Sequence, residues 1–596
     1  MASSRVSDDN EAVIVVGIDF GTTFSGVAWT WSGKAENIEI VTSWEADFHG
    51  NSDNDKVPTA IKLGDNLGGA ITWGYATSEG TDGKEPLKWF KLLLLDDDDL
   101  PADVRESTHL KEARKYLETV NRSAVEIITL FLRHLWNHAL GVIRTEIGES
   151  LVKLSRFHVV ITLPAIWPAY ACARMREAAR DAGIVKQSPG GKSTLSFVSE
   201  PEAAAIATLE EMKGRHDVKD GDSFVVVDCG GGTVDIISYT VVSKEPMVIR
   251  ECVKGEGGLC GAVFVDEAFC QLLKEKVGEP MWSRLPKSKF NRIINDEWEH
   301  GIKPQFTGKN RTWTIELPLE CLGRLSDVSP LALTGLPKVV LTAQDIREAF
   351  KPVLKQIYEL VETQISSVNN KEGREPKYII LVGGFGRCKY LYDCLKNRVG
   401  QLVLQARGSG PWTAICRGAV IKSLSEQCIS RSLDIVEIES RISRASYGVD
   451  FNTEWVDGQF HKKDRYFSSV TQSYRASNQM DWFLREGDDI SKHEPVRRAY
   501  CQRFLEPPAS ISNKILICHA KPPPRRRGAT VKDLCTVTWD TKIDFTRLPT
   551  YTNPIGIVYY QLEYEVEMIS FGGSVDFAVY HNDKRQGSRN VMVDFR

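Results

Sequence analysis

Two short segments of glycine and threonine each follow a buried, strand-like run that ends in aspartate. The first is Asp19 followed by Gly21, Thr22 and Thr23, and the second is Asp228 followed by residues 230–233, GGGT. Glycines let backbone N–H groups approach phosphate oxygens closely, and threonine hydroxyls add donors. An aspartate at a strand end can hold a hydrated magnesium ion, which prefers oxygen ligands and keeps several waters. The repeated pattern predicts a site for a nucleotide phosphate chain and Mg²⁺.

Strands on both sides must position these turns. Val13–Ile18 and Phe24–Trp31 flank the first turn, while Phe224–Val227 and a strand ending near Tyr239 flank the second. This strand–Asp–turn–strand pattern is the only internal repeat that we find in the sequence. A third buried strand, Tyr378–Val382, leads into a further glycine-rich turn and a helix from Cys388. The pattern predicts an α/β region that extends to about residue 424.

Helices and strands between the turns complete this α/β region. Apolar residues three and four apart predict a core-facing helix over residues 124–143. Phe157–Leu163 reads as a buried strand, and a helix follows from about Tyr170 to Ala182, with Gly183 as its stop. After about residue 433 the chain changes to short strands without a long helix, which predicts a separate, mostly antiparallel β domain.

Composition excludes several classes of protein. The 596 residues include 75 Lys and Arg against 79 Asp and Glu, so a dedicated nucleic-acid or electrostatic membrane binder is disfavoured. No stretch approaches the roughly 20 apolar residues of a spanning helix, and the first twelve residues lack an apolar signal core. Thirteen cysteines without a CxxC pair disfavour a zinc ribbon or a disulfide framework. We expect a reducing, cytoplasmic setting.

The turns lie in motifs that resemble those of a known superfamily. GIDFGTTFSGVAW (17–29) resembles the first phosphate motif of the actin-like ATPases, VVVDCGGGTVDIISY (225–239) the second, and IILVGGFGRCKYL (379–391) the adenosine motif. VVITLPAIWP (159–168), EAARDAG (177–183) and SEPEAAAIA (199–207) resemble connecting segments of DnaK-type heat-shock chaperones. LKWFKLLLL (87–95), GLCG (258–261), WEHGIK (298–303) and CRGAV (416–420) point to the divergent, lid-less subgroup of heat-shock-seventy-like proteins.

The resemblance implies an α/β, actin-like two-lobed ATPase fold with a ribonuclease-H-like duplicated core, followed by a smaller, mostly antiparallel β domain. The expected organisation is a disordered tail at 1–11, a nucleotide-binding domain at 12–425, a linker at 426–442, and a β-rich, substrate- or partner-binding-like domain at 443–596.

The resemblance also assigns catalytic roles. Asp19 and Asp228 would hold Mg²⁺ through water, and Glu200 would organise the attacking water. Lys91 would neutralise charge on the transferred phosphoryl group, with Lys88 as a competing candidate. The implied catalytic set is Asp19, Lys91, Glu200, Asp228 and Thr233, with Asp235 in a supporting role.

A second implied set binds ATP or ADP. Its members are Gly21, Thr22, Thr23, Gly230, Gly231, Gly232, Gly261, Glu299, Lys303, Gly383, Gly384, Phe385 and Arg387, with Arg387 stacking on adenine. The chain departs from the family in this region. Pro304 replaces a second base-stacking arginine, Phe385 stands where a serine is usual, the spacing at Glu299 is off by one, and Trp412 replaces an acidic residue. Phosphate and magnesium chemistry is expected to be intact, while the base clamp is altered.

The C-terminal region carries a weaker likeness. SRASYGVDF (443–451) and MDWFLREGDDI (480–490) are similar to parts of the chaperones' β-sandwich substrate domain. LDIVEIES (433–440) lacks the leucine-rich linker, and we expect neither a helical lid nor an EEVD-type tail for tetratricopeptide co-chaperones. Protein or peptide clients, no nucleic acid, no membrane span and a monomeric state are the expectations. The basic segment 521–527 (KPPPRRR) is either a solvated loop or a docking patch.

The expected function is a chaperone-type ATPase of slow turnover, in which Mg²⁺-dependent hydrolysis of ATP is coupled to lobe movement and client binding. Two alternatives stay open at this point. One is a nucleotide-gated scaffold that binds ATP with little hydrolysis, and the other is a small-molecule kinase on the same core.

Overall fold

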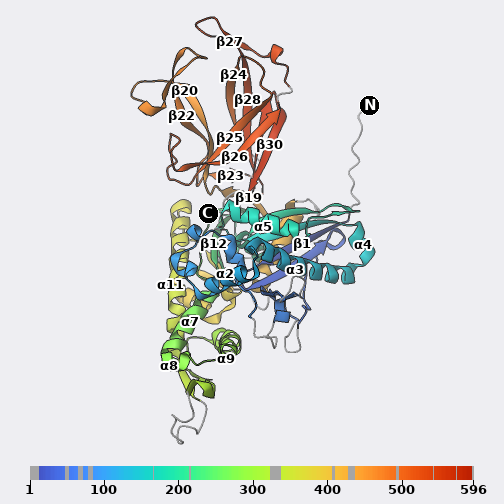
Figure 1. Cartoon of the computed structure of the whole chain (residues 1–596), viewed down its shortest axis with the longest axis vertical. Helices are drawn as coiled ribbons and strands as arrows, with labels where there is room; N and C mark the ends of the chain where they lie inside the picture. Colours follow the sequence, from blue (N-terminus) through green and yellow to red (C-terminus); the bar gives the residue numbers. More distant parts are fainter. Residues whose placement is uncertain are drawn as a thin grey trace. The chain divides into compact units, whose positions relative to one another are not determined.

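The structure is a computed structural model of the chain. It describes residues 12–46, 53–64, 71–77, 85–165, 167–213, 217–322, 337–405, 410–426, 436–491, 495–540, 543–571 and 574–592. Two compact units make up the chain (Figure 1): the first comprises residues 1–166, 173–247 and 255–437, and the second comprises 167–172, 248–254 and 438–596. The expected tail at 1–11 and most of the expected linker lie outside the described residues.

The first unit contains a sheet whose buried central strand is β1 (Val13–Phe20). β1 pairs antiparallel with β2 (Phe24–Trp31) and parallel with β7 (Arg156–Leu163), which in turn pairs parallel with β10 (Thr194–Ser199). The short strands β3 (Glu39–Ile40) and β4 (Val57–Pro58) both pair with β2. All eight residues of β1 are buried, as expected for a strand that is covered on both faces.

A second sheet of the first unit repeats this arrangement. β11 (Ser223–Cys229) pairs antiparallel with β12 (Val234–Ser243) and parallel with β17 (Tyr378–Val382), which pairs parallel with β18 (Leu402–Gln405). The order and the direction of the four strands match those of β2, β1, β7 and β10. This duplication agrees with the two-lobed, actin-like fold with a duplicated core that the resemblance implied.

Helices pack on these sheets where glycines allow close approach. α13 (Gly410–Glu426) lies against β1, and a β-carbon on Gly17 would stand 2.3 Å from the Cys416 carbonyl oxygen. α6 (Glu200–Met212) crosses α13 so closely that a β-carbon on Gly418 would stand 1.7 Å from the Ala203 carbonyl oxygen. These contacts fix α6, and with it Glu200, relative to the strand that carries Asp19.

Three helices agree with the sequence prediction: α3 (Ala124–Ile147), α5 (Ala169–Asp181) and α12 (Lys389–Arg398). α3 begins with a capping box between Ser123 and Glu126, and α5 ends two residues before Gly183. The longer helices that remain are α2 (Thr108–Val120), α7 (Ala262–Val277) and α11 (Ala343–Glu372). Short helices are α1 (Ala102–Arg105), α4 (Glu149–Leu154), α8 (Glu279–Trp282), α9 (Lys287–Arg292), the π-helical segment Ile293–Ile302 and α10 (Lys303–Gln305).

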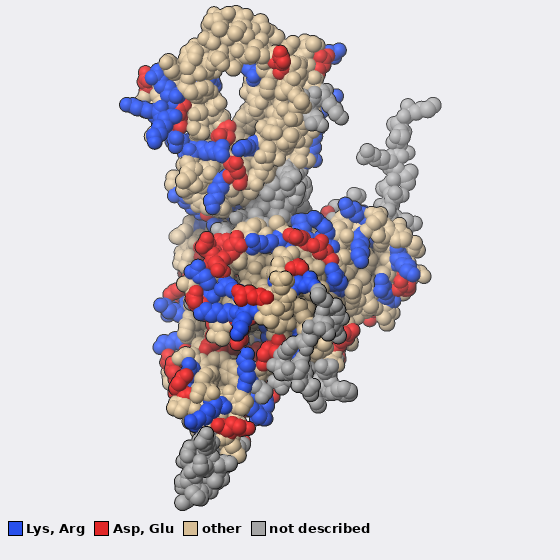
Figure 2. All heavy atoms as spheres, viewed as in Figure 1, with Lys and Arg blue, Asp and Glu red and all other residues tan. Residues whose placement is uncertain are grey.

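Three pairs of short antiparallel strands complete the first unit: β5 (Ile61–Lys62) with β6 (Thr72–Trp73), β8 (Gln187–Ser188) with β9 (Gly191–Lys192), and β15 (Thr312–Glu316) with β16 (Lys338–Thr342). In addition, β14 (Glu256–Gly258) pairs with β12. Basic and acidic side chains are interspersed on the face of this unit that Figure 2 shows. Within the described residues, no helix is long and apolar enough to span a bilayer.

The second unit is built mainly from two antiparallel sheets. One has the order β21 (Arg465–Ser468), β22 (Ser473–Leu484), β20 (Ser446–Glu454), β25 (Ser510–Cys518) and β26 (Val531–Asp540). The other has the order β24 (Val496–Phe504), β28 (Val558–Phe571), β29 (Ser574–His581) and β30 (Lys584–Met592), with β27 (Thr550–Thr552) on β28. Three further strands pair side by side in a sheet, in the order β13 (Val248–Glu251), β19 (Glu437–Ile442) and β23 (Asp489–Ser491).

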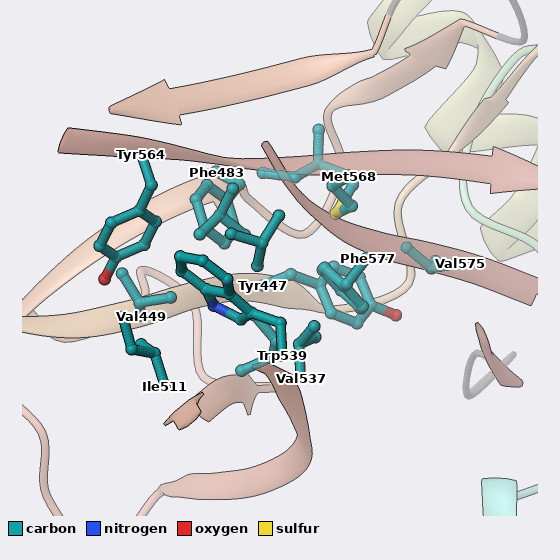
Figure 3. Close-up of a cluster of buried hydrophobic side chains, with 14 of the residues drawn as sticks. Tyr447, Val449, Phe483, Ile511, Val537, Trp539, Tyr564, Met568, Val575 and Phe577 are labelled. Carbon is teal, nitrogen blue, oxygen red and sulfur yellow. The ribbon is translucent and has the colours of Figure 1, made fainter. Parts of the chain in front are cut away.

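Both sheets contribute to one apolar core, which Figure 3 shows. Tyr447 from β20, Trp539 from β26 and Phe577 from β29 are buried in it, together with Phe483 and Met568. Each of these sheets is antiparallel throughout and buries its apolar residues in this core. The prediction of a mostly antiparallel β domain is confirmed.

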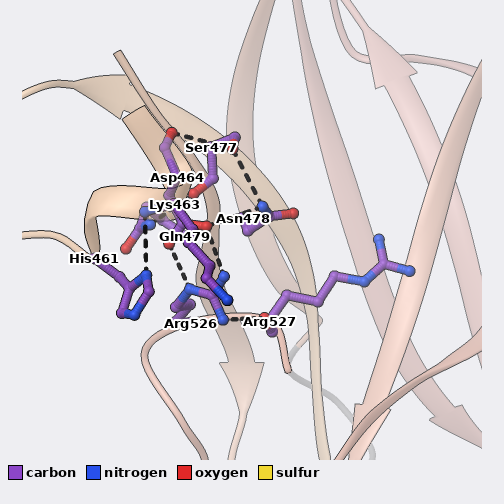
Figure 4. Close-up of polar contacts among 8 residues, drawn as sticks. All are labelled: His461, Lys463, Asp464, Ser477, Asn478, Gln479, Arg526 and Arg527. Carbon is purple, nitrogen blue, oxygen red and sulfur yellow. Dashed lines mark hydrogen bonds and ion pairs between the residues drawn. The ribbon is translucent and has the colours of Figure 1, made fainter. Parts of the chain in front are cut away.

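The basic segment 521–527 is held in place by ion pairs and backbone contacts (Figure 4). Arg526 makes two bonds to the buried carboxylate of Asp464, and Arg527 contacts Asp450 at 3.1 Å. The Arg527 amide donates to the carbonyl oxygen of Asn478 at 2.8 Å. Because these charges are neutralised within the unit, the structure favours a structural loop over a docking patch.

Candidate functional site

The first turn lies where β1 and β2 meet. Asp19 pairs across the strands with Gly26, and its side chain is buried beside the ammonium group of Lys56, with which it forms an ion pair. Burial alone would lower the pKa of Lys56, but the adjacent Asp19 carboxylate outweighs it and the pKa is raised. Gly26 makes room for this lysine, because a β-carbon there would stand 2.9 Å from Lys56 Cγ.

The second turn is fixed by the start of α7. The Gly230 amide donates to the Thr233 carbonyl oxygen at 2.9 Å, which closes the turn. The Ala262 amide donates to the carbonyl oxygen of Gly230 at 3.1 Å. Gly261 precedes the helix, and a β-carbon there would stand 2.4 Å from the Gly231 carbonyl oxygen. Gly261 is therefore required for the approach of the helix to the turn.

The structure brings the two turns together, although about two hundred residues separate them. A β-carbon on Gly231 would stand 2.2 Å from Thr23 Oγ1, and one on Gly232 would stand 2.8 Å from Thr22 Oγ1. The threonine hydroxyls of one turn thus lie in the space that the glycines of the other leave free. Backbone amides and hydroxyl donors of both turns converge there, which is the donor set that phosphate oxygens require.

Carboxylates outnumber ammonium groups beside these turns. The buried carboxylates are those of Asp19, Glu200, Asp228 and Asp235, and the buried ammonium groups are those of Lys56 and Lys91. Burial raises the pKa of Asp228 well above its usual range, and the carboxylates of Glu200 and Asp235 raise it further. Burial and the neighbouring Glu200 raise the pKa of Asp235 to about 7. The cluster therefore has a deficit of positive charge.

The structure distinguishes between the two lysines that the sequence left open. Lys91 Nζ lies 2.7 Å from Glu200 Oε1, and both side chains are buried, whereas Lys88 is exposed. Lys91 lies in a short 3₁₀ helix, Phe90–Leu94, which follows Trp89 in a left-handed conformation with φ +66°. Such strain in a non-glycine residue costs of order 1–3 kcal/mol and is common at functional sites. The pKa of Glu200 is raised because the effect of burial exceeds that of the Lys91 ammonium.

Two of the side chains predicted for the nucleoside end, Glu299 and Lys303, form ion pairs within the unit. Lys303 Nζ lies 2.7 Å from both Asp266 Oδ1 and Glu299 Oε2, so the lysine and the glutamate contact each other. Burial raises the pKa of Asp266 to about 6. Phe385 is only 4% exposed and packs toward Phe350, with ring centroids 6.3 Å apart. Its side chain is therefore buried among apolar residues.

Arg387 and Gly384 lie beside a tryptophan. The Arg387 guanidinium carbon stands 5.3 Å from the ring centroid of Trp412, and a β-carbon on Gly384 would stand 3.5 Å from Trp412 Nε1. The same indole contacts Phe24, which directly follows the first turn, with ring centroids 5.6 Å apart. Gly383, with φ +86°, faces Asp228, because a β-carbon there would stand 2.3 Å from Asp228 Oδ1.

Comparisons with known proteins agree with this geometry. Human heat shock 70 kDa protein 12B is 25% identical over 566 residues, which cover 82% of this chain and 78% of that protein. Mouse heat shock 70 kDa protein 12A is 25% identical over 587 residues, covering 86% and 82%. Human heat shock 70 kDa protein 12A is 25% identical over 572 residues, covering 83% and 80%. The resemblance to divergent heat-shock-70-like proteins is confirmed.

A second comparison concerns the β-rich unit alone. Residues 441–570 of this heat-shock-70-like chain match the family described as a domain of unknown function, DUF8568. The match lies within the second unit and covers the whole of the first of its main sheets, but it ends before β29 and β30 of the other. The description of that family names no ligand or partner.

The sequence did not reveal that Lys56 and Asp266 lie at the candidate site. Trp412 was recognised only as a replacement of the family's acidic residue. Glycine inside a strand often marks the close approach of another group, so Gly26 was the available signal for Lys56. Asp266 lies one turn into α7 and pairs with a lysine 37 positions away, which no local pattern reveals. The contact of Trp412 with Phe24, almost four hundred positions earlier, is likewise invisible to local patterns.

The cluster in this heat-shock-70-like chain fits a magnesium ion. Asp228 Oδ1 is buried and has no hydrogen-bond partner, so one oxygen is left for a cation or for water. Among the described residues, no three His, Cys, Asp or Glu side chains gather closely enough to ligate a metal ion directly. Mg²⁺ usually keeps several of its waters, so Asp19 and Asp228 would hold it through them.

Proposed function

We propose that this heat-shock-70-like chain binds ATP with Mg²⁺ at the paired turns and hydrolyses it to ADP and phosphate. One observation carries the proposal: a buried Lys91–Glu200 ion pair lies in a carboxylate-rich cluster beside two facing Gly/Thr turns. Surface ion pairs are common, but burying an ammonium among several carboxylates costs desolvation energy, and such clusters are typical of functional sites.

The chain's residues would act mainly by positioning and by neutralising charge. Amides of the two turns and the hydroxyls of Thr22, Thr23 and Thr233 would bind the phosphates, and Lys91 would stabilise the charge that develops on the γ-phosphoryl group. Glu200 and Asp228 would orient the attacking water. Mg²⁺, when bound, supplies the positive charge that the cluster lacks.

Single-turnover hydrolysis of ATP tests the proposal. Asp228→Asn keeps the shape of the side chain but removes its charge, and we expect the rate to fall by about 10²–10³. Asp464→Asn is the matched control, because Asp464 is an equally buried aspartate in the second unit. Equal, background-level rates for wild type and Asp228→Asn would refute hydrolysis at this site.

A second candidate function is a nucleotide-gated scaffold that binds ATP with little turnover. The observation that favours it is the altered nucleoside end, where Lys303 is engaged by Asp266 and Glu299, Pro304 replaces an arginine and Phe385 lies in the core. Calorimetric binding of Mg·ATP without release of phosphate would support the scaffold. ADP production at a rate that depends on Lys91 and Asp228 would support the ATPase.

We propose further that the first unit is the nucleotide-binding domain and that the second binds extended protein or peptide clients in a nucleotide-dependent way. Support comes from exposed aromatic side chains on β21 and β22, where Phe467 is 54% and Tyr474 is 50% exposed. Exposed aromatic residues beside cationic ones are typical of protein interfaces, and Arg465 stacks 3.9 Å from the Tyr474 ring centroid. Fluorescence anisotropy of labelled unfolded peptides, with and without ATP, tests this, and Phe467→Ser should weaken binding.

A cytoplasmic location is part of the same proposal. Cys229, Cys260 and Cys416 in the described part of the first unit are buried thiols outside any disulfide, as a reducing compartment would keep them. Imaging of a fluorescently tagged full chain in its native cell would test it, and exclusive enrichment in a secretory compartment would contradict it.

A further inference from the structure

Trp412 stands where the resembling family has an acidic residue. The structure places it between the first Gly/Thr turn and Arg387. Its indole contacts Phe24, the residue after the first turn, and lies under the Arg387 guanidinium. It is half-buried, so part of the ring is still accessible. No other aromatic side chain named at the site has both contacts.

The backbone beside Trp412 is tied to the second turn as well. The Gly383 amide donates to the carbonyl oxygen of Pro411 at 3.2 Å, and Gly383 also lies against Asp228 and the Cys229 carbonyl oxygen. Trp412 is therefore held at a fixed position relative to the strand end that carries the Asp228 carboxylate. A ring held in this way is pre-organised for a ligand and loses little conformational freedom when one binds.

We propose that Trp412 is a nucleotide-binding residue that packs against the nucleoside end of a nucleoside triphosphate. The inference rests on the proposed binding of nucleotide at the paired turns. If the two turns hold the phosphates, the sugar and base must extend past Phe24 toward Gly384 and Arg387, and Trp412 lies between them. Flat aromatic faces and a guanidinium plane are the surfaces on which bases stack.

The remaining residues at the nucleoside end explain why such a surface is needed. Pro304 supplies no planar cation, and Phe385 is turned into the apolar core. Stacking is tolerant of base identity, because every base has a π face, so ATP and GTP should bind with affinities within about threefold of each other.

The test is equilibrium binding of three probes, Mg·ATP, Mg·GTP and Mg·tripolyphosphate, to the full chain and its variants. Trp412→Ala should weaken ATP and GTP by about tenfold, the usual size of one stacking contact, and leave tripolyphosphate unchanged. Trp412→Phe should retain most of the affinity. Trp455→Ala is the matched control, because Trp455 is also half-buried and lies under Arg465, at 5.5 Å, in the second unit.

Each outcome has a distinct meaning. Unchanged ATP affinity in Trp412→Ala, with binding intact in wild type, overturns the inference and leaves the proposed function standing. An equal loss for tripolyphosphate also overturns it, because the indole would then act on the phosphate turns. Failure of the wild type to bind any probe at millimolar concentration refutes the proposed function itself. If Trp412→Ala does not fold, the ATP-induced change in tryptophan fluorescence must be smaller in Trp412→Phe than in wild type, and an equal change overturns the inference.

Discussion

Replacing Lys91 by methionine is the most informative single perturbation of the candidate site. The methionine side chain has a similar length and no charge, so the substitution removes the ammonium that lies 2.7 Å from Glu200 and leaves the carboxylate buried. At an effective dielectric constant of about 20, unit charges at that distance attract by about 6 kcal/mol. Desolvation of both groups offsets much of this, and loss of one partner from a buried pair typically costs about 3–5 kcal/mol.

The expected size of the thermal effect follows from the size of the unit. The first unit comprises about 420 residues, and unfolding entropy is about 2.1 cal/mol/K per residue, so 3–5 kcal/mol lowers its Tm by about 3–6 °C. Lys153→Met is the matched control, since Lys153 pairs with Glu149 at the surface with both side chains exposed. That control should shift the Tm by less than about 1 °C.

The effect of Lys91→Met should also depend on pH. The pKa of Glu200 is already raised by burial, and loss of the ammonium raises it further. A carboxyl whose pKa is raised on folding binds a proton in the native state that the unfolded chain has released, so its stability contribution is lost as pH rises. Lys91→Met should therefore be close to wild type near pH 5 and clearly destabilised near pH 8.

Differential scanning calorimetry at both pH values measures these shifts, and single-turnover hydrolysis measures the chemistry. Glu200→Gln with Lys91→Met should recover part of the lost Tm, because the Glu200 carboxylate is no longer left buried without its ammonium partner. A loss of Tm in Lys91→Met no larger than in Lys153→Met, or one that does not change with pH, would refute the reasoning from the buried pair. A hydrolysis rate unchanged within about twofold would remove Lys91 from the proposed mechanism.

Three further predictions concern other charged groups. Asp235→Asn should flatten the pH dependence of stability, because the Asp235 pKa of about 7 in the folded chain makes wild type lose stability as pH rises from about 4 to about 7. Calorimetry from pH 4.5 to pH 8 checks this, and parallel curves of Tm against pH for wild type and variant would contradict it. Lys56→Met should leave Asp19 without its cation, so added Mg²⁺ should raise the Tm of this variant more than that of wild type; equal responses would count against a magnesium site at Asp19. Arg526→Ala should lower the Tm of the second unit and leave ATP hydrolysis unchanged, because it leaves the buried Asp464 carboxylate without its guanidinium; a lower Tm of the first unit only would show that the loop has another role.

Much of the fold could be predicted because its signals are local. The apolar steps of three and four residues over 124–143 correspond to α3, and the alternation of buried strands with glycine turns corresponds to β1, β2, β11 and β12. The repeat of Asp, Gly and Thr predicted two matching hairpins, since such turns depend on the conformational freedom of a few neighbouring residues. The short strands of the β-rich unit were also visible, although their ends shifted by several residues, as for β26 (Val531–Asp540).

The contacts of the candidate site that join residues far apart in the chain could not be predicted from these patterns. Lys88 and Lys91 are three positions apart in similar surroundings, and only the approach of α6 decides which ammonium meets Glu200, 109 positions away. The resemblance placed Phe385 among the nucleotide-binding residues, and the structure buries its ring beside Phe350, a contact that no local pattern reveals.

The sequence by itself therefore determined the two turns, the strands that carry them and the order of the two units, because glycine content, strand patterning and capping act over a few residues. Tertiary structure alone decided the partners of the charges and rings: Lys56 with Asp19, Lys303 with Asp266, and Trp412 between Phe24 and Arg387. The physical reason is that desolvation and ion pairing depend on distances between residues far apart in the chain, and those distances exist only after the sheets and helices have packed.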